Sequence, residues 1–152
     1  GYISFEPGDT EFPQGIPNEG APNAYIAGWW TDLNPPSGGE IVYGTVGDEG
    51  QREFVVSFLA VPHYLNEEPA TFQIVLRQAD NAAEVHCTEC STDGQEHTQG
   101  VEDDTGTRGT YVPGRVRTTA PLRNDGVRFY TSAVAISDGF GDACDSCPSL
   151  FS

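Results

Sequence analysis

Apolar and polar residues alternate over short stretches of this chain, as expected for β-strands that bury one face. β-branched and aromatic residues fill these stretches, which suits a pleated, half-buried surface. Four runs show the alternation: Ile41, Tyr43 and Thr45; Phe54, Val56 and Phe58; Phe72, Ile74 and Leu76; and Val127, Phe129, Thr131 and Ala133. Nowhere does an apolar spacing of three and four persist for a dozen residues, so no long helix is expected.

Turn-forming residues separate the alternating runs. They stand at 47–50, Asp80-Asn81, Asp93-Gly94, Gly106-Thr107 and 124–126. Short strands with turns between them predict an all-β fold, an antiparallel β-sandwich of jelly-roll-like form with long loops. The stretch Glu6–Asn23, rich in Pro, Gly and acids, is expected to be a surface loop. We assign residues 1–136 to the sandwich and 137–152 to an irregular Asp/Cys-rich C-terminal tail.

The composition limits the possible partners. The chain has 152 residues, 23 acids against 7 bases, a formal charge of −16, and neither Lys nor Met. This charge repels nucleic acid and anionic membrane surfaces. No apolar run approaches the roughly 18 residues of a membrane span. Divalent cations are the partners that such a surface favours.

Two CxxC pairs, Cys87/Cys90 and Cys144/Cys147, admit two interpretations. Their spacing is compatible with zinc, and His86 and His97 stand close to the first pair. The Asp-rich surroundings favour a hard cation over thiolate-bound zinc, and in an exported protein the same pairs form disulfides. We expect each CxxC to pair internally, although spacing alone does not determine connectivity.

The tail carries the most specific motif, Asp138-Gly-Phe-Gly-Asp142-Ala-Cys-Asp145-Ser-Cys-Pro. It resembles the second half of a thrombospondin type 3 repeat, an extracellular calcium-binding unit. The upstream half is absent, because Val134 and Ile136 stand where that family has further Asp residues. Carboxylates repeated along a sharply turning backbone suit Ca²⁺, so Asp138, Asp142 and Asp145 are its predicted ligands. An exposed linker is the alternative interpretation.

Two other acidic groups are candidate calcium ligands. Asp32 and Asn34 flank a turn that ends in Pro35-Pro36. In a strand, Glu102 and Asp104 share one face while Asp103 points away. A solvated acidic loop explains these groups equally well.

Nearly the whole chain shows a second resemblance, to a nidogen-like extracellular β domain. The segments that carry it are Gly1–Phe5, Ile26–Pro35, Phe54–Phe58, Thr71–Leu76 and His97–Asp103. Bacterial secreted and surface proteins contain many such modules. The resemblance implies a secreted β-rich binding or structural module, not an enzyme. No nucleophile–base motif is present in the sequence.

In that family, earlier strands precede the segment that corresponds to Gly1–Phe5. A sheet without them exposes an edge. Either the chain is a fragment, or other copies of this chain cover that edge. Either Gly1–Asp9 or the Cys144–Ser152 tail would pack on a neighbouring copy, with Tyr2, Ile3 and Phe5 as contacts. The leading prediction is therefore a calcium-binding extracellular subunit that assembles head to tail into a fibre.

The alternative is an adhesin-type module that binds a glycan or a cell-surface protein. Trp29 and Trp30 are adjacent, so a strand points one inward and the other outward. The outward indole would offer a stacking surface for a sugar or a protein partner.

Overall fold

The computed structural model describes residues 1–8, 12–64 and 68–130. The 137–152 tail, with Asp138, Asp142, Cys144, Asp145 and Cys147, lies outside the described residues. Within those residues the strands and one short 3-10 helix run in this order: β1 (Tyr2–Ser4), β2 (Tyr25–Trp30), η1 (Pro35–Ser37), β3 (Glu40–Val46), β4 (Glu53–Pro62), β5 (Pro69–Arg77), β6 (Ala83–Cys90), β7 (Thr98–Glu102), β8 (Gly109–Tyr111) and β9 (Leu122–Phe129).

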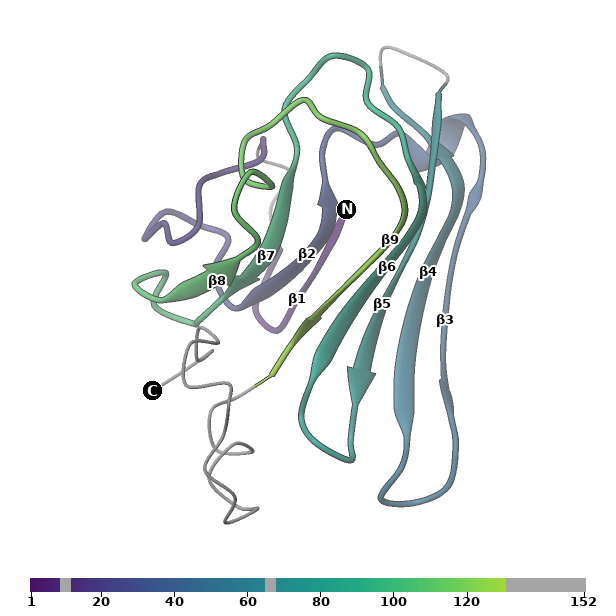
Figure 1. The fold of residues 1–152 in the computed structure, drawn as a ribbon, viewed down its shortest axis with the longest axis vertical. Coiled ribbons are helices and arrows are strands. Elements are labelled where there is room, and N and C mark those ends of the chain that lie inside the picture. The colour runs from purple at the N-terminus through teal and green to yellow at the C-terminus, as the bar shows by residue number, and fades with distance from the viewer. Residues whose placement is uncertain (9–11, 65–67, 131–152) are drawn as a thin grey trace.

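The strands form two antiparallel sheets that face each other (Figure 1). Sheet A has four strands in the order β1-β2-β7-β8, and sheet C has five in the order β3-β4-β5-β6-β9. All strand pairs are antiparallel. The predicted all-β sandwich is confirmed.

The core forms where alternating side chains of the two sheets meet. β4 and β5 pair Val56 with Ile74 and Phe58 with Phe72, so the two apolar runs found in the sequence face the same interior. The rings of Phe58 and Phe72 stack with centroids 4.3 Å apart. Trp29 from β2 is buried against them in the same cluster. Sheet A thus covers the middle of sheet C.

Sheet A is buried on its outer face as well. Tyr25, Ala27 and Trp30 form a second apolar cluster there together with Ile16, which is 5% exposed. The Gln14 carbonyl accepts a hydrogen bond from the Thr98 hydroxyl of β7 at 2.8 Å. Part of the predicted surface loop Glu6–Asn23 is therefore a lid on sheet A, and describing it as surface only was wrong.

Two further local predictions need correction. The predicted turn at 124–126 lies inside β9, where Asp125 pairs with Cys87 and Gly126 with His86. Asn124 keeps turn-like backbone, with φ of 46°, at an irregularity of this strand. Strands β6 and β8 were not among the predicted strands: β6 does alternate buried Ala83, Val85 and Cys87 with polar residues, whereas β8 has only three residues.

Candidate binding surfaces

Strand β3 is the most exposed apolar element of the described structure. All seven of its residues are exposed. Ile41 and Tyr43 pair with Phe58 and Val56, so they share the inner face of sheet C, yet Tyr43 is 76% exposed. Sheet A does not extend over β3, and this part of the inner face is open to solvent. The sequence showed the alternation of β3 but not that its partner sheet stops short.

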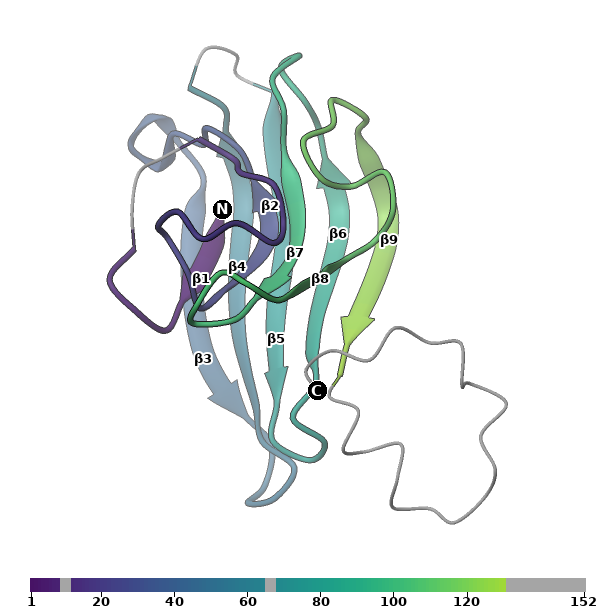
Figure 2. The ribbon, with the colours of Figure 1, turned by 90° about the vertical axis from the view of Figure 1, so that its left-hand side faces the viewer.

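A groove of about 450 Å³ lies between the edge of sheet A at β1 and the inner face of sheet C. Figure 2 shows β1 and β3 on the same side of the sandwich. Asp32 alone among the lining residues is charged; the others include Tyr2, Ile3, Phe12, Leu33, Ile41, Val56 and Phe58. We call this cavity the edge groove.

The backbone of β1 pairs with β2 on one side, and its outer side faces the edge groove. The Phe5 N–H donates to the Ala24 carbonyl at 2.9 Å, and the Gly1 carbonyl accepts from the Trp29 N–H at 3.1 Å. Odd-numbered residues therefore bond to β2. In an antiparallel ladder the alternate residues, Tyr2 and Ser4, direct their backbone N–H and C=O groups to the outer side.

The N-terminal strand β1 pairs with β2 of its own chain. Tyr2, Ile3 and Ser4 pair with Ala27, Ile26 and Tyr25 of their own chain. One side of β1 is therefore used within its own chain, and the prediction that a terminal segment packs on another copy stays a prediction. Tyr2 and Ile3 line the edge groove, whereas Phe5 lies elsewhere, at the cavity described next.

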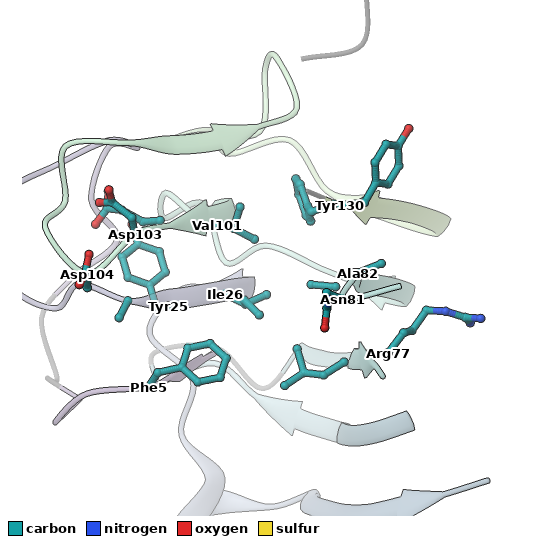
Figure 3. Close-up of a pocket in the computed structure, with 15 residues that line it drawn as sticks. Phe5, Tyr25, Ile26, Arg77, Asn81, Ala82, Val101, Asp103, Asp104 and Tyr130 are labelled. Carbon is teal, nitrogen blue, oxygen red and sulfur yellow. The ribbon is translucent and has the colours of Figure 1, made fainter. Parts of the chain in front are cut away.

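A second cavity, of about 410 Å³, opens between the sheets beside β9. Figure 3 shows Phe5, Ile26, Val101 and Tyr130 around it. Arg77 stands at its rim, held by ion pairs to Glu53 at 2.7 Å and to Glu84 at 3.6 Å. The walls are mostly apolar, and the lining also includes the polar residues Arg77, Asn81, Glu102, Asp103 and Asp104.

Both tryptophans are buried, which contradicts the prediction of one exposed indole. Trp29 is 0% and Trp30 2% exposed. They do point to opposite faces of sheet A, because they belong to its inner and outer clusters. The lid over sheet A covers Trp30, so neither ring is a surface for a sugar.

Glu102 is a buried carboxylate that ties the lid to β7. Its Oε2 accepts the Asn18 N–H at 2.7 Å, and the residue is 4% exposed. Burial raises the pKa of Glu102 to about 7, although the hydrogen bond from Asn18 opposes the rise. Burial and the nearby Glu102 also raise the pKa of Tyr25.

The predicted pairing of Glu102 with Asp104 on one calcium site has no support in this arrangement, because Asp104 is exposed and Glu102 is engaged by the lid. The carboxylate of Asp103 instead orders the hairpin. Desolvation opposes its charge, but N–H donors of Arg108, Thr105 and Thr107 outweigh that effect and lower the pKa of Asp103.

The turn with Asp32 and Asn34 shows no convergent ligands either. The Asn34 amide donates to the Ser37 hydroxyl at 2.6 Å, within the short turn that contains η1. In the part of the chain that the structure describes, no three His, Cys, Asp or Glu side chains converge to hold a metal ion. Calcium binding by the tail stays a prediction.

Cys87 and Cys90 form a disulfide, as predicted. This excludes both thiolates as zinc ligands in the oxidised chain. His86 lies on β6 and contacts Glu84 at 2.8 Å. The zinc alternative for this pair, with His86 and His97, is therefore wrong.

His97 is a buried histidine whose environment the sequence did not reveal. It is 1% exposed and stacks on Trp29 with ring centroids 3.5 Å apart. Burial, with a smaller effect of His63, lowers the pKa of His97 to about 4. Because it stacks on Trp29 of the inner cluster, His97 is a packing residue of the sandwich.

Comparison with known proteins gives one finding. A family model described as NIDO related matches residues 1–140. The chain belongs to the NIDO-related family. No curated protein and no solved structure matches this NIDO-related chain.

The NIDO-related assignment indicates an extracellular module of the structural or adhesion type. It confirms the nidogen-like resemblance; the thrombospondin likeness of the tail stays a prediction. Within the described part of this NIDO-related chain, no helix has the length and apolar character to cross a membrane.

The titrations of Glu102 and His97 oppose each other. Between its unfolded pKa of 4.5 and its folded value of about 7, Glu102 holds its proton only in the folded state, so stability falls as pH rises. His97 has a folded pKa of about 4 and an unfolded value of 6.5, so its contribution is lost as pH falls through this window. The two effects partly cancel near pH 5–6.

Glu102→Gln removes only the first effect, because the amide oxygen still accepts the Asn18 N–H. We expect the melting temperature of the variant relative to wild type to rise as pH increases from about 4.5 to about 7. Asp104→Asn, which removes an exposed carboxylate of the same segment, serves as the charge control. A constant difference between Glu102→Gln and wild type across this range would show that the buried carboxyl does not titrate as described.

Proposed function

We propose that this chain is a non-catalytic extracellular structural subunit whose edge groove accepts a β-strand from another copy. One observation carries the proposal. The inner face of β3 is apolar and uncovered, and it lies beside the outer backbone edge of β1. An added strand would pair with the backbone of β1 and cover Ile41 and Tyr43 in a single step.

The position of the added strand follows from the order of the sheets. Strand β2 packs over β5 and β6, and β1 lies next to β2. A strand beyond β1 would therefore lie over β4 and β3. Sheet A would then have five strands, the same number as sheet C. A single charged lining residue, Asp32, favours an uncharged apolar guest.

The Cys144–Ser152 tail of a neighbouring copy is the donor that we propose. Its last seven residues, 146–152, carry no charged side chain and include Leu150 and Phe151. Such a segment could bind in the edge groove of an acidic neighbouring copy without bringing further negatively charged side chains into the contact. Donation from one copy to the next is head to tail, and a head-to-tail contact that does not close into a ring grows into a filament.

Binding of a glycan or a foreign cell-surface protein is the weaker alternative. Its sequence support was an exposed indole, and both indoles are buried. Calcium belongs to the leading proposal, on the support of Asp138, Asp142 and Asp145 in the sequence and of the −16 charge.

Ser4→Pro tests the edge groove directly. Proline removes the Ser4 N–H, which faces away from β2, and edge strands tolerate proline where the lost N–H faces outward. Ser4→Ala is the matched control, since it loses the same hydroxyl and keeps the N–H. We expect wild type and Ser4→Ala to form filaments in negative-stain micrographs, and Ser4→Pro to form none while its circular dichroism stays unchanged.

Deletion of residues 144–152 removes the proposed donor and is expected to abolish filaments as well. If wild type at high concentration forms no filament, or if Ser4→Pro assembles as well as Ser4→Ala, strand addition at β1 is wrong.

Calcium is expected to stabilise the folded chain. A ligand that binds only the folded state at 100 times its dissociation constant adds about 2.7 kcal/mol. Thermal melts in excess Ca²⁺ and in chelator measure this effect, and Asp142→Asn with Asp145→Asn should remove it. Coincident melts of wild type in both buffers would contradict calcium binding.

A further inference from the structure

The outer backbone edge of β3 is a second open surface, distinct from the edge groove. It continues sheet C, whereas the groove continues sheet A. Natural sheets protect such edges with lysine, proline, bulges or very short strands. Strand β3 has seven residues in continuous pairing with β4, and it contains neither Lys nor Pro. Its only charged side chain, Glu40, stands at one end.

Apolar side chains flank this edge on both faces. Ile41 and Tyr43 lie on the inner face, and Val42 and Val46 on the outer face are 45% and 57% exposed. Leu59 of β4 adds to the outer patch at 38% exposure. Half of the exposed large apolar side chains of the described residues thus belong to β3 and its neighbour, which marks an association surface.

We propose that β3 pairs antiparallel with β3 of a second copy, about a two-fold axis at Tyr43. The proposed binding partner of β3 is therefore the same strand of another copy. With this register Tyr43 faces Tyr43, Ile41 faces Thr45, and Glu40 faces Val46 of the other copy. No charged residue of the strand faces another, so the acidic chain avoids like-charge contact along the pair.

Shape also favours a second copy. Val42 of one strand lies opposite Gly44 of the other, and a side chain built on Gly44 would meet no atom within 4 Å. Val42 of each copy would therefore lie in the open space beside Gly44 of the other copy. A two-fold axis repeats every contact, as isologous dimers require. The pair joins two five-stranded sheets into one continuous sheet.

The dimer and the filament use different backbone edges, although both contacts involve the Tyr43 side chain. Strand addition uses the backbone of β1 and the inner face of sheet C, and the dimer uses the outward backbone of β3. The full chain carrying Ser4→Pro retains the β3 edge, so it is expected to dimerise whether or not strands add at β1, and the variants below are compared in this background. The filament proposal and the dimer proposal can therefore be rejected by different results.

Cysteine cross-linking tests the register. Residues directly opposite in an antiparallel pair have Cα atoms roughly 4.5–5.5 Å apart, within disulfide range. Tyr43→Cys is therefore expected to form a disulfide between the substituted positions of two copies on mild oxidation, identified by mass spectrometry of the linked peptides. Val46→Cys is the matched control. In the proposed register, residue 46 of one copy and residue 46 of the other lie six positions apart along the strands, about 20 Å, which is too far for a disulfide. Equal linking of both variants would overturn the proposed register.

Charge substitution tests the dimer without oxidation. Tyr43→Lys places two like charges opposite each other and is expected to weaken the dimer roughly tenfold or more by sedimentation equilibrium. Tyr43→Phe keeps the aromatic pair and should dimerise like wild type. A monomeric wild type at millimolar concentration, or equal affinities for Tyr43→Lys and Tyr43→Phe, overturns the proposal. A complex with a foreign basic strand in place of self-association overturns it as well.

Discussion

An apolar sheet face has to be covered, and most of this structure follows from how each face is covered. The inner face of sheet C is covered by β2 and β7, through contacts that bury Phe72, Ile74 and Trp29 completely. The outer face of sheet A is covered by the lid that contains Ile16. The inner face of β3 has no such cover in the described residues. The edge strands β1 and β3 lie on that side of the sandwich (Figure 2), and so do both proposed contacts.

Charged and titratable groups affect both the association of copies and the pH dependence of folding stability. The strongly acidic surface opposes association, so contacts between copies are expected where charge is sparse, as in the edge groove and along β3. In the interior, Glu102 holds the lid as a buried acid and His97 packs on Trp29 as a buried base. Their opposed pKa shifts partly cancel in the pH dependence of stability.

The sequence predicted the fold well because alternation reports directly which strands bury a face. Ile41, Tyr43 and Thr45 showed the same alternation as Phe54, Val56 and Phe58, yet only the second set is covered. Coverage depends on the width of the opposite sheet, which no local pattern encodes. The buried Trp30 was missed for the same reason, since the lid over it comes from a Pro-rich segment without strand pattern. Cys87 and Cys90 were predictable because short spacing and an exported context favour their pairing.

The central claim is that, among the described residues, the apolar inner face left uncovered beside β1 and β3 is where copies of this chain associate. Amide hydrogen exchange at low and high protein concentration tests it most directly. The account predicts that peptides from β1 and β3 exchange rapidly when dilute and gain protection on association, while β5 and β6 remain slow throughout. Strands β8 and β9, the opposite edges of the two sheets, should not change. Protection that appears at β8 and β9, with β1 and β3 unchanged, would contradict the account.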